Sequence, residues 1–130
     1  MRFRLLFSIV IVMLIVLVLR TYIARPYTPF VDAPELAAML RQETPPLIVD
    51  TRTKEQFAKA HIPGSINVSK ADFEAVLAEA NPSTRVVVIC PTGRESVELT
   101  RRLLSAGVDA TYLRGGFAVW KGAVESSGTR

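Results

Sequence analysis

The longest uncharged apolar stretch of the chain lies close to its start. LLFSIVIVMLIVLVL occupies residues 5–19 between Arg4 and Arg20. As a helix it covers about 22 Å, against a hydrocarbon core of roughly 30 Å. Extending the helix to residues 3–24 supplies the roughly 20 residues that a bilayer span needs, provided that Arg20 reaches the headgroups with its guanidinium. We therefore predict a membrane anchor over residues 1–25.

A cleaved secretory signal is the alternative reading of this segment, because it also has a positive start and an apolar middle. Such a signal ends in small residues, whereas here the exit reads LRTYIAR over residues 19–25. Tyr22 stands where a small residue is wanted if cleavage followed Ala24. The sequence favours a retained signal-anchor over a cleaved signal.

The formal net charge of +4 is accounted for by this segment, which carries Arg2, Arg4, Arg20 and Arg25. From Pro26 onward, basic and acidic side chains balance. The excess basic groups thus flank an apolar run and form no stripe on a folded surface, so we expect no nucleic-acid partner. Arg2, Arg4 and the terminal amine favour an N-terminus inside the cell, which places the folded part on the outer, periplasmic or extracytoplasmic side.

Cysteine and histidine each occur once, as Cys90 and His61. A single cysteine excludes an intramolecular disulfide, and one cysteine with one histidine cannot supply a four-ligand zinc site by themselves. We expect neither a metal nor another cofactor. Cys90 is either an inert core residue or a reactive thiol, and its position in the chain alone leaves both readings open.

A short spacer and a single domain are expected after the anchor. Residues 26–29 hold two prolines, which disfavour helix and indicate an extended linker. We assign residues 30–125 to one folded domain and residues 126–130 to a disordered tail. Asp32 is expected to cap a first helix through its side chain, with Glu35 reaching back.

Strand and helix patterns alternate along this domain. Leu47–Asp50 and Arg85–Ile89 are apolar runs of strand type, the second dominated by β-branched residues. Further strands are expected at 66–68 and 110–113, and helices at 53–58, 71–80 and 96–106. This alternation predicts an α/β domain with a mainly parallel central sheet.

Cys90 lies where a buried strand ends and a helix is about to begin. In open α/β sheets, ligands bind outside the carboxyl ends of the strands. The unpaired N–H groups and the dipole of a helix N-terminus stabilise a thiolate and attract an anion. Gly93 allows the loop amides to turn inward, and the guanidinium of Arg94 suits an oxyanion such as the sulfonate end of thiosulfate.

Four separated segments, in order, resemble the signatures of the rhodanese family. They are D-T-R followed by E-Q-F at residues 50–57, H-I-P-G-S-I-N at 61–67, the cysteine loop C-P-T-G-R-E-S at 90–96, and L-R-G-G with a later tryptophan at 113–120. The resemblance covers residues 30 to 123. It implies a three-layer α/β fold, here preceded by one transmembrane helix.

The resemblance also implies sulfur transfer. In that family the cysteine thiolate takes a sulfane sulfur from thiosulfate or a persulfide donor, and passes it to cyanide, a thiol or a protein thiol acceptor. Carried over, Cys90 is the nucleophile, and the substrate or persulfide-binding loop consists of Thr92, Gly93, Arg94, Glu95 and Ser96. Many active members carry arginine where this chain has Glu95, so the donor preference stays open.

The other signature residues are interpreted as structural. Asp50 and Arg52 are expected to form an ion pair or a capping interaction, and His61 a hydrogen bond that fixes a turn. Gly115–Gly116 and Trp120 are expected to form a tight turn and a core anchor outside the active site. A membrane-tethered rhodanese-like module that binds a protein without catalysis remains the alternative function.

Overall fold

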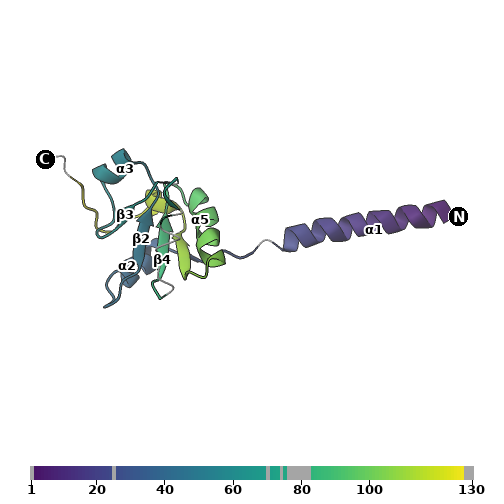
Figure 1. The fold of residues 1–130 in the computed structure, drawn as a ribbon, viewed down its shortest axis with the longest axis horizontal. Coiled ribbons are helices and arrows are strands. Elements are labelled where there is room, and N and C mark those ends of the chain that lie inside the picture. Colours follow the sequence, from purple (N-terminus) through teal and green to yellow (C-terminus); the bar gives the residue numbers. More distant parts are fainter. Residues whose placement is uncertain (1, 25, 70, 74, 76–82, 128–130) are drawn as a thin grey trace.

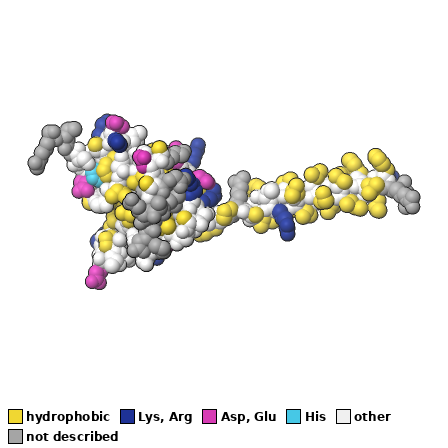
Figure 2. Space-filling view, viewed as in Figure 1, with side chains coloured by type: hydrophobic (Ala, Val, Ile, Leu, Met, Phe, Trp, Pro, Cys, Tyr) yellow, Lys and Arg dark blue, Asp and Glu magenta, His cyan; other side chains and the backbone are white. Residues whose placement is uncertain are grey.

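The computed structural model describes residues 2–24, 26–69, 71–73, 75 and 83–127. Helix α1 (Arg2–Ile23) stands apart from the rest of the chain, and Figure 2 shows hydrophobic side chains along its length. Within it, Phe3–Ile23 is long and apolar enough to cross a membrane, with a mean hydropathy of 2.6 and no part buried by protein. Near an N-terminus, a signal sequence has the same properties.

The remainder forms an α/β domain around a five-stranded sheet with the order β1-β5-β4-β2-β3 (Figure 1). Every pair of neighbouring strands in it is parallel. The strands are β1 (Phe30–Val31), β2 (Leu47–Asp50), β3 (Ile66–Asn67), β4 (Val86–Ile89) and β5 (Ala110–Leu113). The predicted parallel α/β fold is confirmed.

The two faces of the sheet bury separate clusters because side chains alternate along a strand. Val87 and Ile89 point to the face covered by α2 (Ala33–Met39), together with Leu36, Met39 and Trp120. Val86 and Val88 point to the opposite face, with Leu99 and Leu103 of α5 (Arg94–Ser105). All four residues of β4 are buried, so this strand is the centre of a three-layer domain.

Helix α3 (Lys54–Lys59) begins with a capping box formed by Thr53 and Gln56. The backbone hydrogen bond of Glu55 and then the hydroxyl of Thr53 lower the pKa of the Glu55 carboxyl. The helix predicted at 71–80 lies mostly outside the described residues. The prediction for 96–106 is confirmed, with α5 starting two residues earlier at Arg94.

One prediction at the start of the domain was wrong in detail, the side-chain cap at Asp32. Asp32 precedes α2, but its side chain makes no capping hydrogen bond. Its carboxylate instead accepts from Arg114 at 2.6 and 2.8 Å. Thr28, within the expected extended linker, is buried, and its hydroxyl accepts from Arg101 at 2.9 Å. This residue therefore packs against α5.

The described end of the chain, up to Ser127, makes backbone contacts with the domain. Ser127 donates its N–H to the carbonyl of Ala58 at 3.1 Å, and Glu125 pairs with His61 in an isolated antiparallel bridge. The chain thus stays attached to α3 as far as Ser127, because its backbone finds partners there. Residues 128–130 lie outside the described part.

Candidate active site at the cysteine loop

Cys90 follows β4 directly, at the carboxyl edge of the sheet. The next strand, β2, ends beside it, since Thr51 donates both its N–H and its hydroxyl to the carbonyl of Ile89 at 2.8 and 3.0 Å. The cysteine is free and 0% exposed. The sole thiol of the chain therefore lies at the position where α/β proteins bind ligands, beneath the surface.

The loop folds back so that a backbone amide faces the sulfur. Gly93 donates its N–H to the Cys90 Sγ at 3.0 Å. Gly93 has a φ of 84°, in the left-handed region that favours glycine, and it is the N-cap of α5. The thiol therefore lies in the loop between β4 and α5, next to the positive end of the α5 dipole.

A second loop supports the cysteine loop from behind. We call residues 115–118 the inner wall. Phe117 donates its N–H to the Cys90 carbonyl at 2.9 Å, and Ala118 donates to the Pro91 carbonyl at 3.1 Å. A Cβ at Gly116 would lie 2.3 Å from that same Cys90 oxygen and 2.5 Å from the Gly93 nitrogen. Backbone meets backbone here, with no room for a side chain.

This contact places Gly115–Gly116 against the candidate site, whereas the motif predicts a tight turn outside it. The reason is the 3-10 helix η1 (Gly116–Val119), which starts in the left-handed region at Gly115 and turns its first amides toward the cysteine loop. The glycine pair in the sequence predicts the turn, but it does not predict that the turn contacts the cysteine loop. Trp120, predicted as a core anchor, is 9% exposed and belongs to the α2 cluster.

The predicted ion pair lies behind the inner wall. Arg52 donates to both carboxylate oxygens of Asp50, the shortest contact being 2.7 Å, and both residues are buried. The same guanidinium donates to the Ala60 carbonyl at 2.8 Å and lies 3.5 Å from the ring centroid of Phe117. The Asp50–Arg52 pair thus supports Phe117, whose amide holds the Cys90 carbonyl.

The predicted substrate-binding residues divide into two groups. Thr92, Arg94 and Glu95 are exposed, and we call these three the outer rim. Gly93 and Ser96 are buried. The Ser96 hydroxyl has no hydrogen-bond partner among the described residues. Its side chain lies inside the first turn of α5, so the structure brings only the outer rim to the surface.

His61 contacts α3 and the C-terminal segment. Its Nδ1 lies 2.7 Å from the Phe57 carbonyl, and its ring stacks on that of Phe57 at 3.8 Å. Its Nε2 lies 3.2 Å from Glu125, which also accepts from the Gly64 amide. These contacts support the structural reading of His61. Among the described residues, no cluster of three or more metal-ligating side chains forms.

The chain is thus a three-layer parallel α/β domain whose single cysteine lies between the central strand and a helix N-terminus. The chain matches the model of the Rhodanese-like domain over residues 32–123. It belongs to that family, and the resemblance predicted from the motifs is confirmed.

Curated relatives include sulfurtransferases. The chain is 33% identical over 90 residues to thiosulfate sulfurtransferase GlpE of Pseudomonas aeruginosa, with 68% of this chain and 81% of that protein covered. It is 36% identical over 81 residues to a tRNA sulfurtransferase of Desulfurococcus amylolyticus. That match covers 62% of this chain and only 16% of the longer protein.

Solved structures show the same fold. A rhodanese-like domain protein from Staphylococcus aureus aligns with a TM-score of 0.70 and 26% identity, covering 76% of this chain and 98% of that chain. A thiosulfate sulfurtransferase from Pseudomonas aeruginosa aligns with a TM-score of 0.67 and 31% identity. There the coverage is 79% of this chain and 21% of the solved one. Sulfur transfer is thus the activity that the names of these relatives share.

Proposed function

We propose that this chain is a sulfurtransferase that carries a sulfane sulfur on Cys90. The thiolate attacks the outer sulfur of thiosulfate or of a persulfide donor. The donor's S–S bond breaks, and its electron pair leaves with sulfite or with the donor thiolate. Cyanide, a thiol or a protein thiol then attacks the outer sulfur of the persulfide and releases the Cys90 thiolate.

The hydrogen bond from the Gly93 amide to the Cys90 Sγ, at 3.0 Å, carries this proposal. A sulfur that already accepts from a loop amide at a helix N-terminus is held where negative charge is stabilised. The outer rim adds the guanidinium of Arg94 for an anionic donor. Thr92, Glu95 and the backbone of the loop complete the proposed substrate-binding site, with Gly93 and Ser96 as its buried part.

Full burial of Cys90 favours a second candidate function. Reactive cysteines are usually partly exposed, whereas a fully buried thiol is more often inert. On this reading the domain is a rhodanese-like module that binds a protein partner without chemistry. For sulfur transfer to occur, a donor must reach this buried thiol, and the residues that follow it in the loop, Pro91 and Thr92, are exposed.

A mass measurement separates the two functions. The full-length chain, with and without Cys90→Ser, is incubated with excess thiosulfate or with a persulfide donor, and the intact protein is weighed. We expect the parent alone to gain one sulfur atom and to lose it to cyanide as thiocyanate. If a folded parent gains no sulfur from either donor, the binding module replaces the enzyme.

We also propose that α1 holds the domain at a membrane, with the domain on the outer side. The apolar run and the flanking arginines support this, as argued from the sequence. Protease added to cells whose outer barrier has been opened, with the cytoplasmic membrane still intact, should digest an epitope-tagged C-terminus, while lysis of the cytoplasmic membrane should add no further digestion. An epitope protected until that membrane is lysed would reverse the orientation, and a chain found in the soluble fraction would show a cleaved signal.

A further inference from the structure

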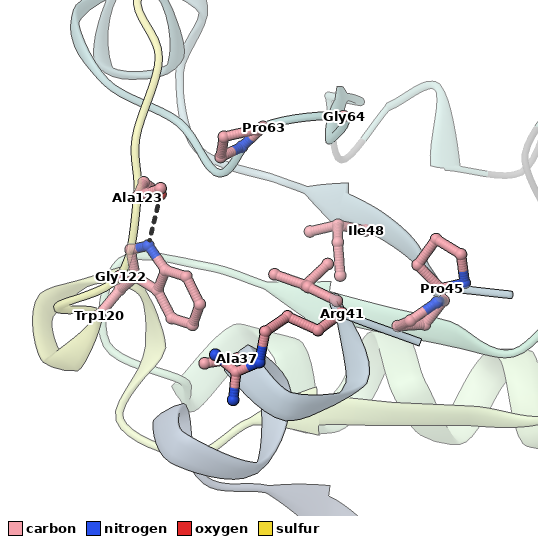
Figure 3. Close-up of a pocket in the computed structure, with 11 residues that line it drawn as sticks. Ala37, Arg41, Pro45, Ile48, Pro63, Gly64, Trp120, Gly122 and Ala123 are labelled. Atoms are coloured by element: carbon pink, nitrogen blue, oxygen red, sulfur yellow. Dashed lines mark hydrogen bonds between the residues drawn. The ribbon is translucent and has the colours of Figure 1, made fainter. Parts of the chain in front are cut away.

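A pocket of about 370 Å³ opens on the α2 side of the sheet (Figure 3). None of its described lining residues belongs to the cysteine loop. Its walls are mostly apolar and come from α2, β2, the turn at residues 63–64 and the segment after η1; they include Ala37, Leu40, Ile48, Pro63 and Trp120. Its volume falls within the range of roughly 300–1,000 Å³ in which proteins bind small ligands.

The Trp120 ring forms one wall of the pocket, and Gly122 leaves room for it. The indole Nε1 donates to the Ala123 carbonyl at 3.0 Å, which fixes the ring. A Cβ at Gly122 would lie 2.3 Å from the ring carbon Cζ2. Gly122 has no positive φ, so its backbone does not require glycine. A larger residue at position 122 would collide with the Trp120 ring, which lies against the Gly122 backbone. The position of the ring is therefore fixed before any ligand binds.

Arg41 is the one charged residue among those described as lining this pocket. It is exposed, and Figure 3 shows its side chain extending from the end of α2 toward the side on which Trp120 lies. No described residue forms an ion pair or a hydrogen bond with the Arg41 side chain. A guanidinium free to pair at the mouth of an apolar pocket matches a carboxylate, which it can bind through two parallel hydrogen bonds.

We propose that this pocket binds a small ligand that joins an apolar body to one carboxylate. The apolar body lies against Trp120 and Ile48, and the carboxylate pairs with Arg41. The site is separate from the sulfur chemistry proposed for Cys90, so it stands whether or not the domain is an enzyme. Trp120 is the only tryptophan of the chain and lines this pocket, so its emission responds to a ligand bound there without background from a second indole.

The test uses the full-length chain in phosphatidylcholine vesicles, with 3-phenylpropionate as the probe and 3-phenylpropionamide as its neutral match. Binding is followed by Trp120 emission and by calorimetry. We expect the carboxylate to bind at least about fivefold more tightly than the amide, the size of one charge-assisted hydrogen bond at a partly exposed site.

Three variants make the test specific. Arg41→Gln should weaken the carboxylate about fivefold and leave the amide unchanged. Lys59→Gln, which removes an exposed positive charge outside the pocket, should change neither. Ala37→Leu should fill the pocket and weaken both probes. The proposal is overturned if the parent binds neither probe, if it binds both equally, or if Arg41→Gln binds the carboxylate as the parent does. A signal that persists in a folded Ala37→Leu variant also overturns it, because it reflects partition into lipid.

Discussion

The inner wall and the outer rim flank the same cysteine but differ in burial and in charge. At the inner wall, backbone atoms of Gly116 and Phe117 press against the carbonyl of Cys90, and the buried Asp50–Arg52 pair stands behind them. The outer rim holds exposed side chains of both signs, Arg94 and Glu95. The comparison assigns two roles: the wall sets the loop's shape and stability, and the rim meets whatever approaches Cys90.

The largest effect is expected at the buried ion pair. Arg52→Met removes one partner and leaves the Asp50 carboxylate buried without its cation, which should lower the free energy of unfolding by about 3–5 kcal/mol. Urea denaturation followed by Trp120 emission measures it. Arg85→Met is the matched control, because the Arg85–Asp109 pair is exposed and should be worth at most about 1 kcal/mol. Equal losses in the two variants would refute the supporting role of Arg52.

Gly116→Ala attacks the wall at its closest contact. The new Cβ would meet the Cys90 carbonyl and the Gly93 nitrogen, and the residue would also be forced to keep a φ of 64°. Strain and overpacking together should cost about 2–4 kcal/mol, and the rate of sulfur uptake by Cys90 should fall with the displaced loop.

Gly64→Ala separates these two costs. Gly64 has a similar φ of 76°, but a Cβ there meets nothing within 4 Å. Gly64→Ala should lower the free energy of unfolding only by the cost of a positive φ in alanine, about 1–2 kcal/mol. Its rate of sulfur uptake should equal that of the parent. If both alanine variants took up sulfur at the parent rate, the contact with Gly116 would have no part in positioning Cys90.

The sequence predicted the parts of this site that local pattern encodes. Strand β4 consists of three valines and an isoleucine, and the cysteine that follows it is the only one, so its place at the sheet edge could be foreseen. The Asp50–Arg52 pair lies within one short motif. The contact between Gly93 and Gly116 could not be foreseen, because it depends on how β5 brings a distant turn beside the loop.

Two local features at the start of the domain could not be foreseen for a similar reason. Strand β1 has only two residues and exists through pairing with Tyr112 and Leu113, far along the chain. Asp32 has the position of a capping residue, yet its carboxylate pairs with Arg114, a stronger, charged partner that local sequence does not reveal. Tertiary contacts overrode local preference at both places.

Arg94→Gln tests the rim with a smaller expected effect. Loss of the guanidinium should reduce kcat/KM for thiosulfate roughly fivefold to tenfold, as expected for one charge-assisted contact with an anion. The free energy of unfolding should stay within about 0.5 kcal/mol of the parent, because Arg94 is exposed. A large loss of stability with an unchanged kcat/KM would show that Arg94 stabilises the loop and does not contact the donor.

Glu95→Gln should have the smallest effect and the opposite sign. The Glu95 carboxylate is exposed at the first turn of α5, where it repels an anionic donor approaching Cys90. Its removal should raise kcat/KM for thiosulfate about twofold to threefold, since charges at the surface interact weakly. The gain should shrink at high salt, which screens such repulsion. Glu98→Gln, one turn further along α5, is the control and should leave kcat/KM unchanged; an equal gain there would show that total charge, and not the rim, governs the approach of the donor.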